Sequence, residues 1–407
     1  MNRSLAAAMR RALASTRASD IAKATRVIQD ALAGPTFVAD DASRSAGQGS
    51  MPPLIDPGAD IGGPSAAPEI SSPPKAPNAR RAGEASQRLR KPLAEALQAL
   101  REGLPGARAP GIKRQSPPAI PEGARFLTRS FSCPAGTRNY KLYIPAAAPA
   151  CPQGLVVMLH GCKQDPDDFA AGTSMNKVAE TNGLAVAYPG QSSSANSSSC
   201  WNWFSPADQT RGAGEPSIIA GITRELMSEF GLDRSQTFVA GLSAGGAMAA
   251  VMGETYPDLY AAVGIHSGLA YGSANDVVSA FAAMRGDVVF SPAKRRPEVE
   301  AGARVRTIVF QGSADQMVHP SNAARIAGAA SGHAGSGAPE QRAGSAGGRN
   351  YRRMVVAGSD GAPVVECWLV DGAGHAWTGG HPSGSYTDPK GPDASREMAR
   401  FFLNRPA

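Results

Sequence analysis

The sequence has few of the residues that hold small or metal-dependent folds together. It contains 5 cysteines among 407 residues and no CxxC pair, so neither a disulfide-built scaffold nor a zinc ribbon is expected. No run of 18 apolar residues occurs, which excludes an ordinary membrane-spanning helix. Only 4 residues are tryptophan, so a loop that gathers several of them requires an explanation. We expect no bound metal ion.

The excess of positive charge is confined to the N-terminal third. Residues 1–125 carry 18 Lys and Arg against 11 Asp and Glu, which accounts for the whole formal charge of +7. The remaining 282 residues carry 23 of each sign. Aromatic residues do not interleave with the basic ones before residue 126, so nucleic-acid binding is not expected.

Residues 1–34 combine arginines with aliphatic side chains at helical spacing, such as Leu5, Met9 and Leu13. This pattern predicts one or two amphipathic helices with a basic polar face. Arginines such as Arg10 interrupt what would be the apolar core of a secretory signal. We expect the segment to adsorb to a hydrophobic granule or an anionic surface. The alternative is a solvated basic tail.

Residues 35–125 have the composition of a linker. Between positions 52 and 121 they hold 14 of the 33 prolines, mixed with Gly, Ala and Ser. Such a segment buries too little apolar surface to offset a chain entropy of roughly 1–2 kcal/mol per residue. We therefore predict a largely disordered leader, with a short helix at 86–101.

From residue 126 the pattern changes to alternating strands and helices, which predicts one α/β domain over 126–407. Because the strands are nearly continuously apolar, they favour a mostly parallel sheet covered by helices on both faces. The first two strands are expected to form an antiparallel edge, and the Gly/Ala/Ser-rich patch at 328–349 a surface loop. The predicted strands are 126–131, 139–144, 155–159, 184–188, 236–240, 261–266, 305–310 and 364–370, and the predicted helices are 166–182, 215–230, 244–256, 319–330 and 393–403.

The most informative motif is Gly241-Leu242-Ser243-Ala244-Gly245, which follows a predicted strand and opens a predicted helix. In this setting Gly-x-Ser-x-Gly forms a strained turn that exposes the serine hydroxyl, and side chains at the two glycine positions would collide with neighbouring backbone. We predict Ser243 to be a nucleophile. The alternative is a structural turn with a capping serine.

A serine nucleophile requires a base beside it and an acid that orients the base. In the chain order serine, acid, histidine, Asp315 and His375 each follow a predicted strand. The competing acid is Asp371, which we interpret as a turn residue. The competing bases are His319, which begins a predicted helix, and His381.

When a serine attacks a carbonyl carbon, the carbonyl oxygen of the tetrahedral intermediate becomes negatively charged. Two backbone N–H groups must also stabilise this oxyanion, and each is typically worth ~3 kcal/mol. Ala244, directly after the nucleophile, provides one. We assign the other to the Cys162 amide, because Leu159-His160-Gly161-Cys162 ends an earlier strand. His160 is interpreted as a buried residue that ties down this loop rather than as a catalytic group.

Aromatic residues lie in further segments that we expect near the carboxyl ends of the predicted parallel strands, where the candidate catalytic residues also lie. Trp201 and Trp203 lie in the loop segment Cys200-Trp201-Asn202-Trp203-Phe204, and Tyr271 follows the strand 261–266. We predict all three to bind substrate. The alternative for the tryptophans is that they pack beneath the loop.

Several separated motifs together resemble the catalytic domain of polyhydroxybutyrate (PHB) depolymerase-type esterases, which are related to feruloyl and acetylxylan esterases. The resemblance implies an α/β-hydrolase fold, hydrolysis of carboxylic esters through an acyl-enzyme, and no cofactor. It agrees with Ser243, Asp315 and His375 as a catalytic triad. The motifs are LHGCKQD at 159–165, Tyr188-Pro189, CWNWF at 200–204, GLSAGGAM at 241–248 and GHAW at 374–377.

The resemblance also implies a disulfide between Cys162 and Cys200. Their separation of 38 residues would make it worth up to ~4 kcal/mol in the chain-entropy model. Cys133 and Cys151 could pair across the edge hairpin, which leaves Cys367 in its strand. In a reducing compartment all five would be small core residues.

The expected substrates are PHB-type polyesters or their oligomers. The alternatives are a feruloyl or acetylxylan esterase, and a polymer-binding protein whose catalysis is vestigial. Family members are commonly secreted, but the N-terminus contains no readable signal, so both an extracellular and a cytoplasmic location stay open.

Overall fold

The computed structural model describes residues 120–148, 150–287, 305–332 and 339–404, all within one compact unit, Pro105–Ala407. The predicted helices at 1–34 and 86–101, and the linker up to residue 119, lie outside the described residues. None of the helices in the described ranges is long and apolar enough to cross a membrane.

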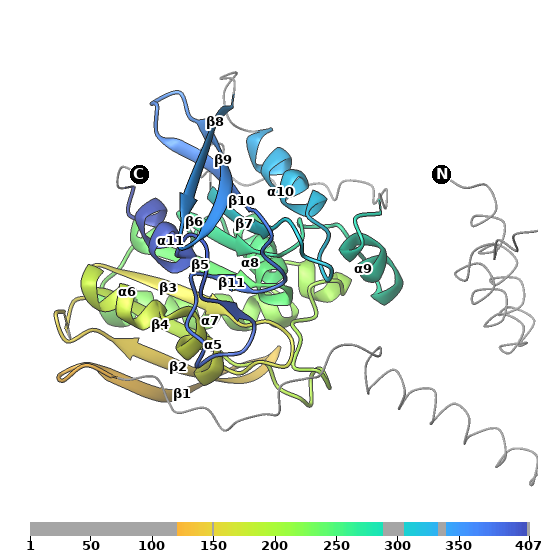
Figure 1. Cartoon of the computed structure of the whole chain (residues 1–407). Helices are drawn as coiled ribbons and strands as arrows, with labels where there is room; N and C mark the ends of the chain where they lie inside the picture. The colour runs from red at the N-terminus through yellow and green to blue at the C-terminus, as the bar shows by residue number, and fades with distance from the viewer. Residues whose placement is uncertain (1–119, 149, 288–304, 333–338, 405–407) are drawn as a thin grey trace, which may run out of the picture. The chain divides into compact units, whose positions relative to one another are not determined.

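The domain is built on a ten-stranded sheet in the order β1-β2-β4-β3-β5-β6-β7-β10-β9-β8 (Figure 1). The six central strands are parallel, as the predicted α/β architecture requires. They are β4 (Leu184–Pro189), β3 (Gly154–Leu159), β5 (Thr237–Leu242), β6 (Ala262–His266), β7 (Arg306–Gly312) and β10 (Pro363–Val370). At one edge β1 (Arg125–Cys133) and β2 (Gly136–Ile144) form the predicted antiparallel pair.

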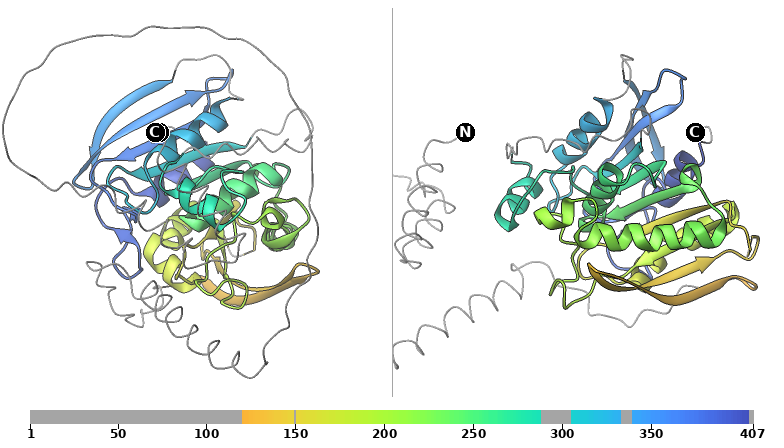
Figure 2. Two further views of the ribbon diagram at one scale, coloured as in Figure 1. Left: turned by 90° about the vertical axis from the view of Figure 1, so that its right-hand side faces the viewer. Right: turned by 180° about the vertical axis from the view of Figure 1, so that it is seen from behind.

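Helices cover both faces of this sheet, as Figure 2 shows from two further sides. Because successive strand residues point to opposite faces, Val157 packs into one core cluster and its neighbour Val156 into the other. The Val157 face contacts α7 (Gly214–Phe230), α8 (Ala244–Thr255), α9 (Val277–Met284) and α10 (Ser321–Ser331). The Val156 face contacts α5 (Pro166–Thr173), α6 (Met175–Asn182) and α11 (Ala394–Phe402). Burial on both faces explains why these strands are almost wholly apolar.

One helix prediction needs correction, and one helix was missed. The predicted helix 166–182 is two helices, because Ser174 adopts a left-handed conformation (φ 52°) that ends α5 and precedes α6. The helix α9 was not predicted. It buries only Ala280 and Ala283, so it lacks the periodic apolar stripe by which a core-facing helix is recognised.

The prediction of a surface loop over 328–349 is wrong. After α10, residues Glu340–Ala346 form β8, which pairs antiparallel with β9 (Arg349–Ala357). Most of β8 is exposed, so it shows no apolar alternation. The usable signal is the pair Gly347-Gly348, both at positive φ, because a Gly-Gly pair suits a two-residue hairpin turn.

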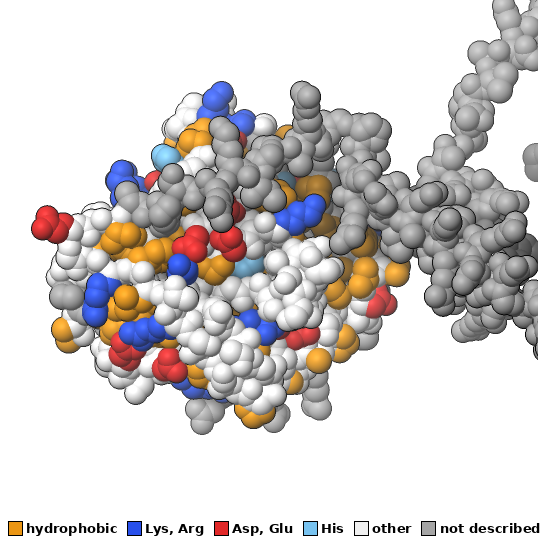
Figure 3. Space-filling model, turned by 90° about the horizontal axis from the view of Figure 1, so that it is seen from below, with side chains coloured by type: hydrophobic (Ala, Val, Ile, Leu, Met, Phe, Trp, Pro, Cys, Tyr) orange, Lys and Arg blue, Asp and Glu red, His pale blue; other side chains and the backbone are white. Residues whose placement is uncertain are grey.

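The short elements lie in the connections. They are the 3₁₀ turns η1 (Pro206–Gln209) and η2 (Arg234–Gln236) and a parallel pair of two-residue strands, β11 (Trp377–Thr378) and β12 (Thr387–Asp388). On the face drawn in Figure 3, basic and acidic side chains are intermixed. This agrees with the equal numbers of each sign after residue 125.

Candidate active site

Ser243 lies at a sharp turn between β5 and α8. Its backbone angles, φ 57° and ψ −118°, fall where non-glycine residues rarely occur, and such strain concentrates at functional sites. A Cβ on Gly241 would lie 2.4 Å from the carbonyl group of Gly245, and one on Gly245 would lie 2.0 Å from Leu159 O. The predicted reason for both glycines is therefore confirmed. Ser243 is part-exposed, whereas its neighbours on both sides are buried.

Asp315 and His375 meet after the ends of two adjacent parallel strands, β7 and β10. His375 Nδ1 lies 2.8 Å from Asp315 Oδ2. The loops also share backbone contacts, since Ala314 N–H donates to Ala373 O (3.0 Å). With Nδ1 engaged by the carboxylate, His375 Nε2 is the ring nitrogen left for proton transfer.

The Asp315 side chain is fully buried and held in its charged form. Its Oδ1 accepts from the N–H groups of Met317 and Val318, both at 2.9 Å, and Gln311 Nε2 donates to Oδ2 at 2.9 Å. Burial alone would raise the Asp315 pKa. The hydrogen bond and charge of His375, with the two backbone N–H groups, outweigh burial and lower the pKa below its usual value.

The competing residues lie elsewhere. Asp371 is exposed and occupies a turn, as interpreted from the sequence. His319 Nδ1 pairs with Ser321 at the start of α10, and His381 Nδ1 pairs with Ser383. The described residues contain no hydrogen bond between the Ser243 hydroxyl and the His375 ring, so their direct contact stays a prediction.

The segment after β3 lies beside Ser243, because β3 and β5 are neighbours. A Cβ on Gly161 would be 3.6 Å from Ser243 Cβ. Gly161 N–H donates to Gln164 Oε1 (2.9 Å). Among the described residues, by contrast, the N–H groups of Cys162 and Ala244 donate to no protein atom. No protein acceptor thus competes for these two amides, and their role in receiving an oxyanion stays a prediction.

His160 is buried and ties loops together, as interpreted from the sequence. Its Nε2 accepts from Gln191 N–H (3.0 Å), so Nδ1 carries the proton and donates to Gly161 O (2.8 Å). Burial lowers the His160 pKa, which keeps the ring in this neutral form.

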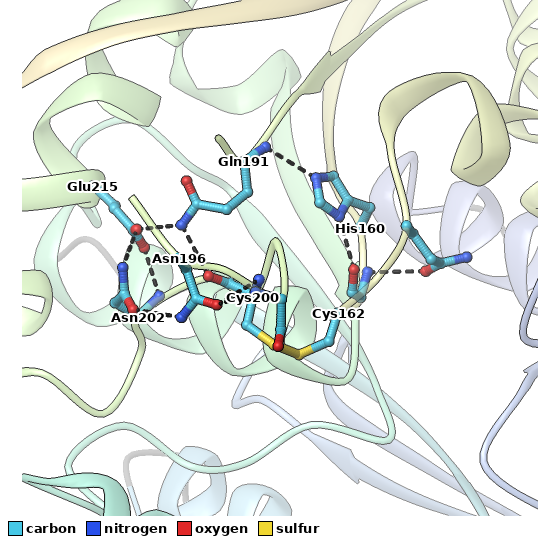
Figure 4. Close-up of a disulfide and its surroundings, with 10 residues drawn as sticks. His160, Cys162, Gln191, Asn196, Cys200, Asn202 and Glu215 are labelled. Atoms are coloured by element: carbon cyan, nitrogen blue, oxygen red, sulfur yellow. Dashed lines mark hydrogen bonds between the residues drawn. A yellow bond between two sulfur atoms is a disulfide. The ribbon is translucent and has the colours of Figure 1, made fainter. Parts of the chain in front are cut away.

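The disulfide implied by the resemblance joins Cys162 to Cys200 (Figure 4), with a Cα–Cα distance of 4.2 Å. The pairing of Cys133 with Cys151 is wrong, because both are free. Cys133 lies at the turn end of the β1–β2 hairpin, whereas Cys151 follows the opposite end of β2. Nine strand residues, at about 3.4 Å each, separate these ends. Cys367 lies in β10 as predicted, and burial raises its pKa to about 11.

The predicted substrate-binding aromatics differ in their surroundings. Trp201 is fully buried and Trp203 is 6% exposed, and both pack in the cluster on the Val157 face. Their burial favours the alternative that they pack beneath the loop. Tyr271 is partly buried against the same cluster, and its hydroxyl donates to Gln209 O (3.2 Å).

His266, the last residue of β6, was not predicted from the motifs. It stacks between Phe310 and Trp377, with ring centroids at 5.8 and 5.1 Å. Its Nε2 accepts from Thr378 N–H (3.1 Å), three residues beyond His375. Burial, and then the charge of His375, lowers the His266 pKa to about 3. A neutral His266 therefore anchors the segment that carries His375. The available signal was a histidine at the C-terminal end of a buried strand, where His160 also lies, one residue past the end of β3.

Gln164 belongs to the motif LHGCKQD at 159–165, but the sequence predicted no role for it. While its Oε1 accepts from Gly161, its Nε2 donates to Asp168 Oδ2 (2.9 Å) and to Ser385 O (3.0 Å). Ser385 N–H in turn donates to Asp168 Oδ1 (2.8 Å). This buried side chain thus joins the segment after β3 to the segment after His375.

In the parts of the chain that the structure describes, no group of three or more His, Cys, Asp or Glu side chains is arranged to hold a metal ion.

The chain is similar to known esterases. The family model described as "Esterase PHB depolymerase" matches residues 138–336. Poly(3-hydroxyalkanoate) depolymerase C of Paucimonas lemoignei is 31% identical over 252 residues, which are 60% of this chain and 60% of that protein. Feruloyl esterase B of Neurospora crassa is 30% identical over 213 residues, covering 48% of this chain and 69% of the relative. The chain thus spans about three fifths of the depolymerase.

A solved structure agrees with the fold. The acetyl xylan esterase from Aspergillus awamori matches with a TM-score of 0.55 and 25% sequence identity, over 69% of this chain and 99% of that chain. This confirms the predicted α/β-hydrolase fold. Together with the matches in sequence, it shows that the chain belongs to the PHB depolymerase-type esterase family.

Proposed function

We propose that this domain is a serine esterase, which hydrolyses carboxylic esters and acts on PHB-type polyesters or their oligomers. The observation that carries the proposal is the Asp315–His375 pair, which lies at the sheet edge where the strained turn presents Ser243. The depolymerase among the relatives supports the choice of polyester.

In the proposed reaction, Ser243 Oγ attacks the ester carbonyl carbon and its proton passes to His375 Nε2. Asp315 holds Nδ1 and stabilises the imidazolium that forms. The carbonyl electron pair moves to oxygen, and the N–H groups of Cys162 and Ala244 receive that oxyanion.

Collapse of this intermediate expels the alcohol, which takes the proton from His375, and leaves an acyl-enzyme on Ser243. Water then attacks the acyl carbon while His375 accepts its proton. The ester bond to Ser243 breaks as His375 returns this proton to Ser243 Oγ, and a free 3-hydroxy acid, or an oligomer ending in one, is released. These steps consume one water per ester bond and need no cofactor.

We assign Tyr271 to the substrate surface, because it remains only partly buried on the segment after β6. Trp201 and Trp203 would act from beneath, by supporting the loop above them. A Tyr271→Ala variant is then the informative one for substrate affinity.

The proposal is tested by Ser243→Ala. Ester turnover should fall by several orders of magnitude with the fold unchanged, as measured by release of acid and by circular dichroism. Ser217→Ala is a matched control, since Ser217 lies in α7 and its hydroxyl donates to Gly214 O within the same helix. Near-full turnover by Ser243→Ala would remove Ser243 from the mechanism.

The likeness to an acetyl xylan esterase and to a feruloyl esterase makes a feruloyl or acetylxylan esterase the second candidate. Parallel assays on PHB film, methyl ferulate and acetylated xylan separate these substrates. A fluorophosphonate probe separates all of them from a polymer-binding protein with vestigial catalysis, because it labels only an activated serine.

A further inference from the structure

A buried carboxylate outside the proposed chemistry lies at the start of α7. Glu215 is 4% exposed and accepts three hydrogen bonds (Figure 4). Asn202 N–H donates to Oε2 and Asn202 Nδ2 to Oε1, both at 2.7 Å, and Gln191 Nε2 also donates to Oε1. Burial raises the pKa of Glu215 above its usual value, and the N–H donors of Asn202 and Gln191 oppose that rise because they bind the ionised form. Arg138 Nη2 lies 3.8 Å from Oε1.

The donors come from both sides of Cys200. Gln191 Nε2 donates to Cys200 O as well (2.9 Å). On the other side, Asn202 Oδ1 accepts from Asn196 Nδ2 (2.9 Å), and Asn196 Oδ1 accepts from Cys200 N–H (3.4 Å). Glu215 thereby fixes the backbone that carries Cys200.

Cys200 is bonded to Cys162, and the residues around Cys162 are tied to the same segment. Lys163 N–H donates to Ser198 O (2.8 Å), and Gln191 N–H donates to His160 Nε2 (3.0 Å). These contacts fix the backbone around Cys162, and with it the unpaired Cys162 N–H group, to the loop that Glu215 anchors.

We propose that Glu215 is a positioning residue for the oxyanion site, acting through Cys200 and the disulfide on the Cys162 amide. The inference rests on the proposed function, since it requires that amide to receive the oxyanion. A group that fixes such a donor affects the transition state more than substrate binding, because the oxyanion exists only after Ser243 has bonded to the carbonyl carbon.

The test is Glu215→Gln, which keeps the shape but places an NH₂ group against N–H donors. With active sites counted by fluorophosphonate labelling, kcat should fall about 10- to 100-fold and KM should change less than about 3-fold. Affinity for a trifluoromethyl ketone, which forms an oxyanion with Ser243, should fall by the same factor as kcat/KM. Asn202→Ala removes one donor and should show the same pattern at about 10-fold or less.

Glu366→Gln is the matched control, because Glu366 is a fully buried carboxylate paired with Arg353 and Arg400 in β10. Glu366→Gln should lower the free energy of unfolding but leave kcat per labelled site equal to that of the native protein. In a Cys200→Ser background, Glu215→Gln should cost less kcat than in the native chain, since the connection is already cut.

An unchanged kcat per labelled site in both Glu215→Gln and Asn202→Ala would overturn the inference, as would full additivity with Cys200→Ser. A fully active Ser243→Ala would instead defeat the proposed function, so the two failures are distinguishable.

Discussion

The buried His266 predicts a specific loss of stability in mild acid. Its pKa is about 3 in the folded protein, against about 6.5 for a solvated histidine. Between these values the unfolded chain binds a proton that the folded protein excludes, so stability rises with pH across this window and falls on acidification. From pH 7.5 to 5 the contribution of this one group is about −2 kcal/mol.

The measurement is urea unfolding of the native protein and of His266→Gln at both pH values. Gln at this position keeps an acceptor for Thr378 N–H but does not titrate. We expect the native protein to lose about 2 kcal/mol more than His266→Gln on acidification. Val309→Ala serves as control, because it removes buried volume from the other face of the sheet and should cost the same at both pH values. Equal acid sensitivity of the native protein and His266→Gln would refute the reasoning.

Three further outcomes are expected. Cys200→Ser should lower the free energy of unfolding by up to about 4 kcal/mol, and Cys133→Ser should lower it much less, as denaturation curves would show; equal losses would contradict the disulfide's role. Asp315→Asn should reduce kcat by roughly 10⁴-fold. Because folding lowers the Asp315 pKa, the variant should also be less stable than the native protein at pH 7, and this difference in unfolding free energy should shrink as the pH falls through that pKa. A difference independent of pH would argue against a charged Asp315. Deleting residues 1–119 should weaken association with polymer granules in a sedimentation assay while soluble-ester turnover persists; unchanged association would reject a role for the basic segment.

The sequence predicted the parts of the fold that depend on apolar pattern. All eight predicted strands are present, because strands buried on both faces appear as short apolar runs. The exposed hairpin β8–β9 was missed, since polar residues on an outer strand carry no such pattern. The break at Ser174 was missed because a single left-handed serine leaves little trace in composition.

The residues of the candidate site likewise fall into those that a sequence pattern identified and those that it missed. Asp315 and His375 were identified because a known chain order limits which acid and which base can meet. The roles of Gln164, His266 and Glu215 were not, because each acts through contacts with segments far away in sequence. Such contacts depend on the fold and not on local spacing.

The hairpin at the end of the sheet has a consequence for solubility. β8 is the outermost strand of the described sheet, and a free strand edge is a template for pairing with a second molecule. Glu340 and Arg342, both exposed and paired at 2.6 Å, place charges along that edge. Charge there discourages edge-to-edge stacking, so variants that make β8 aliphatic should be the first to precipitate.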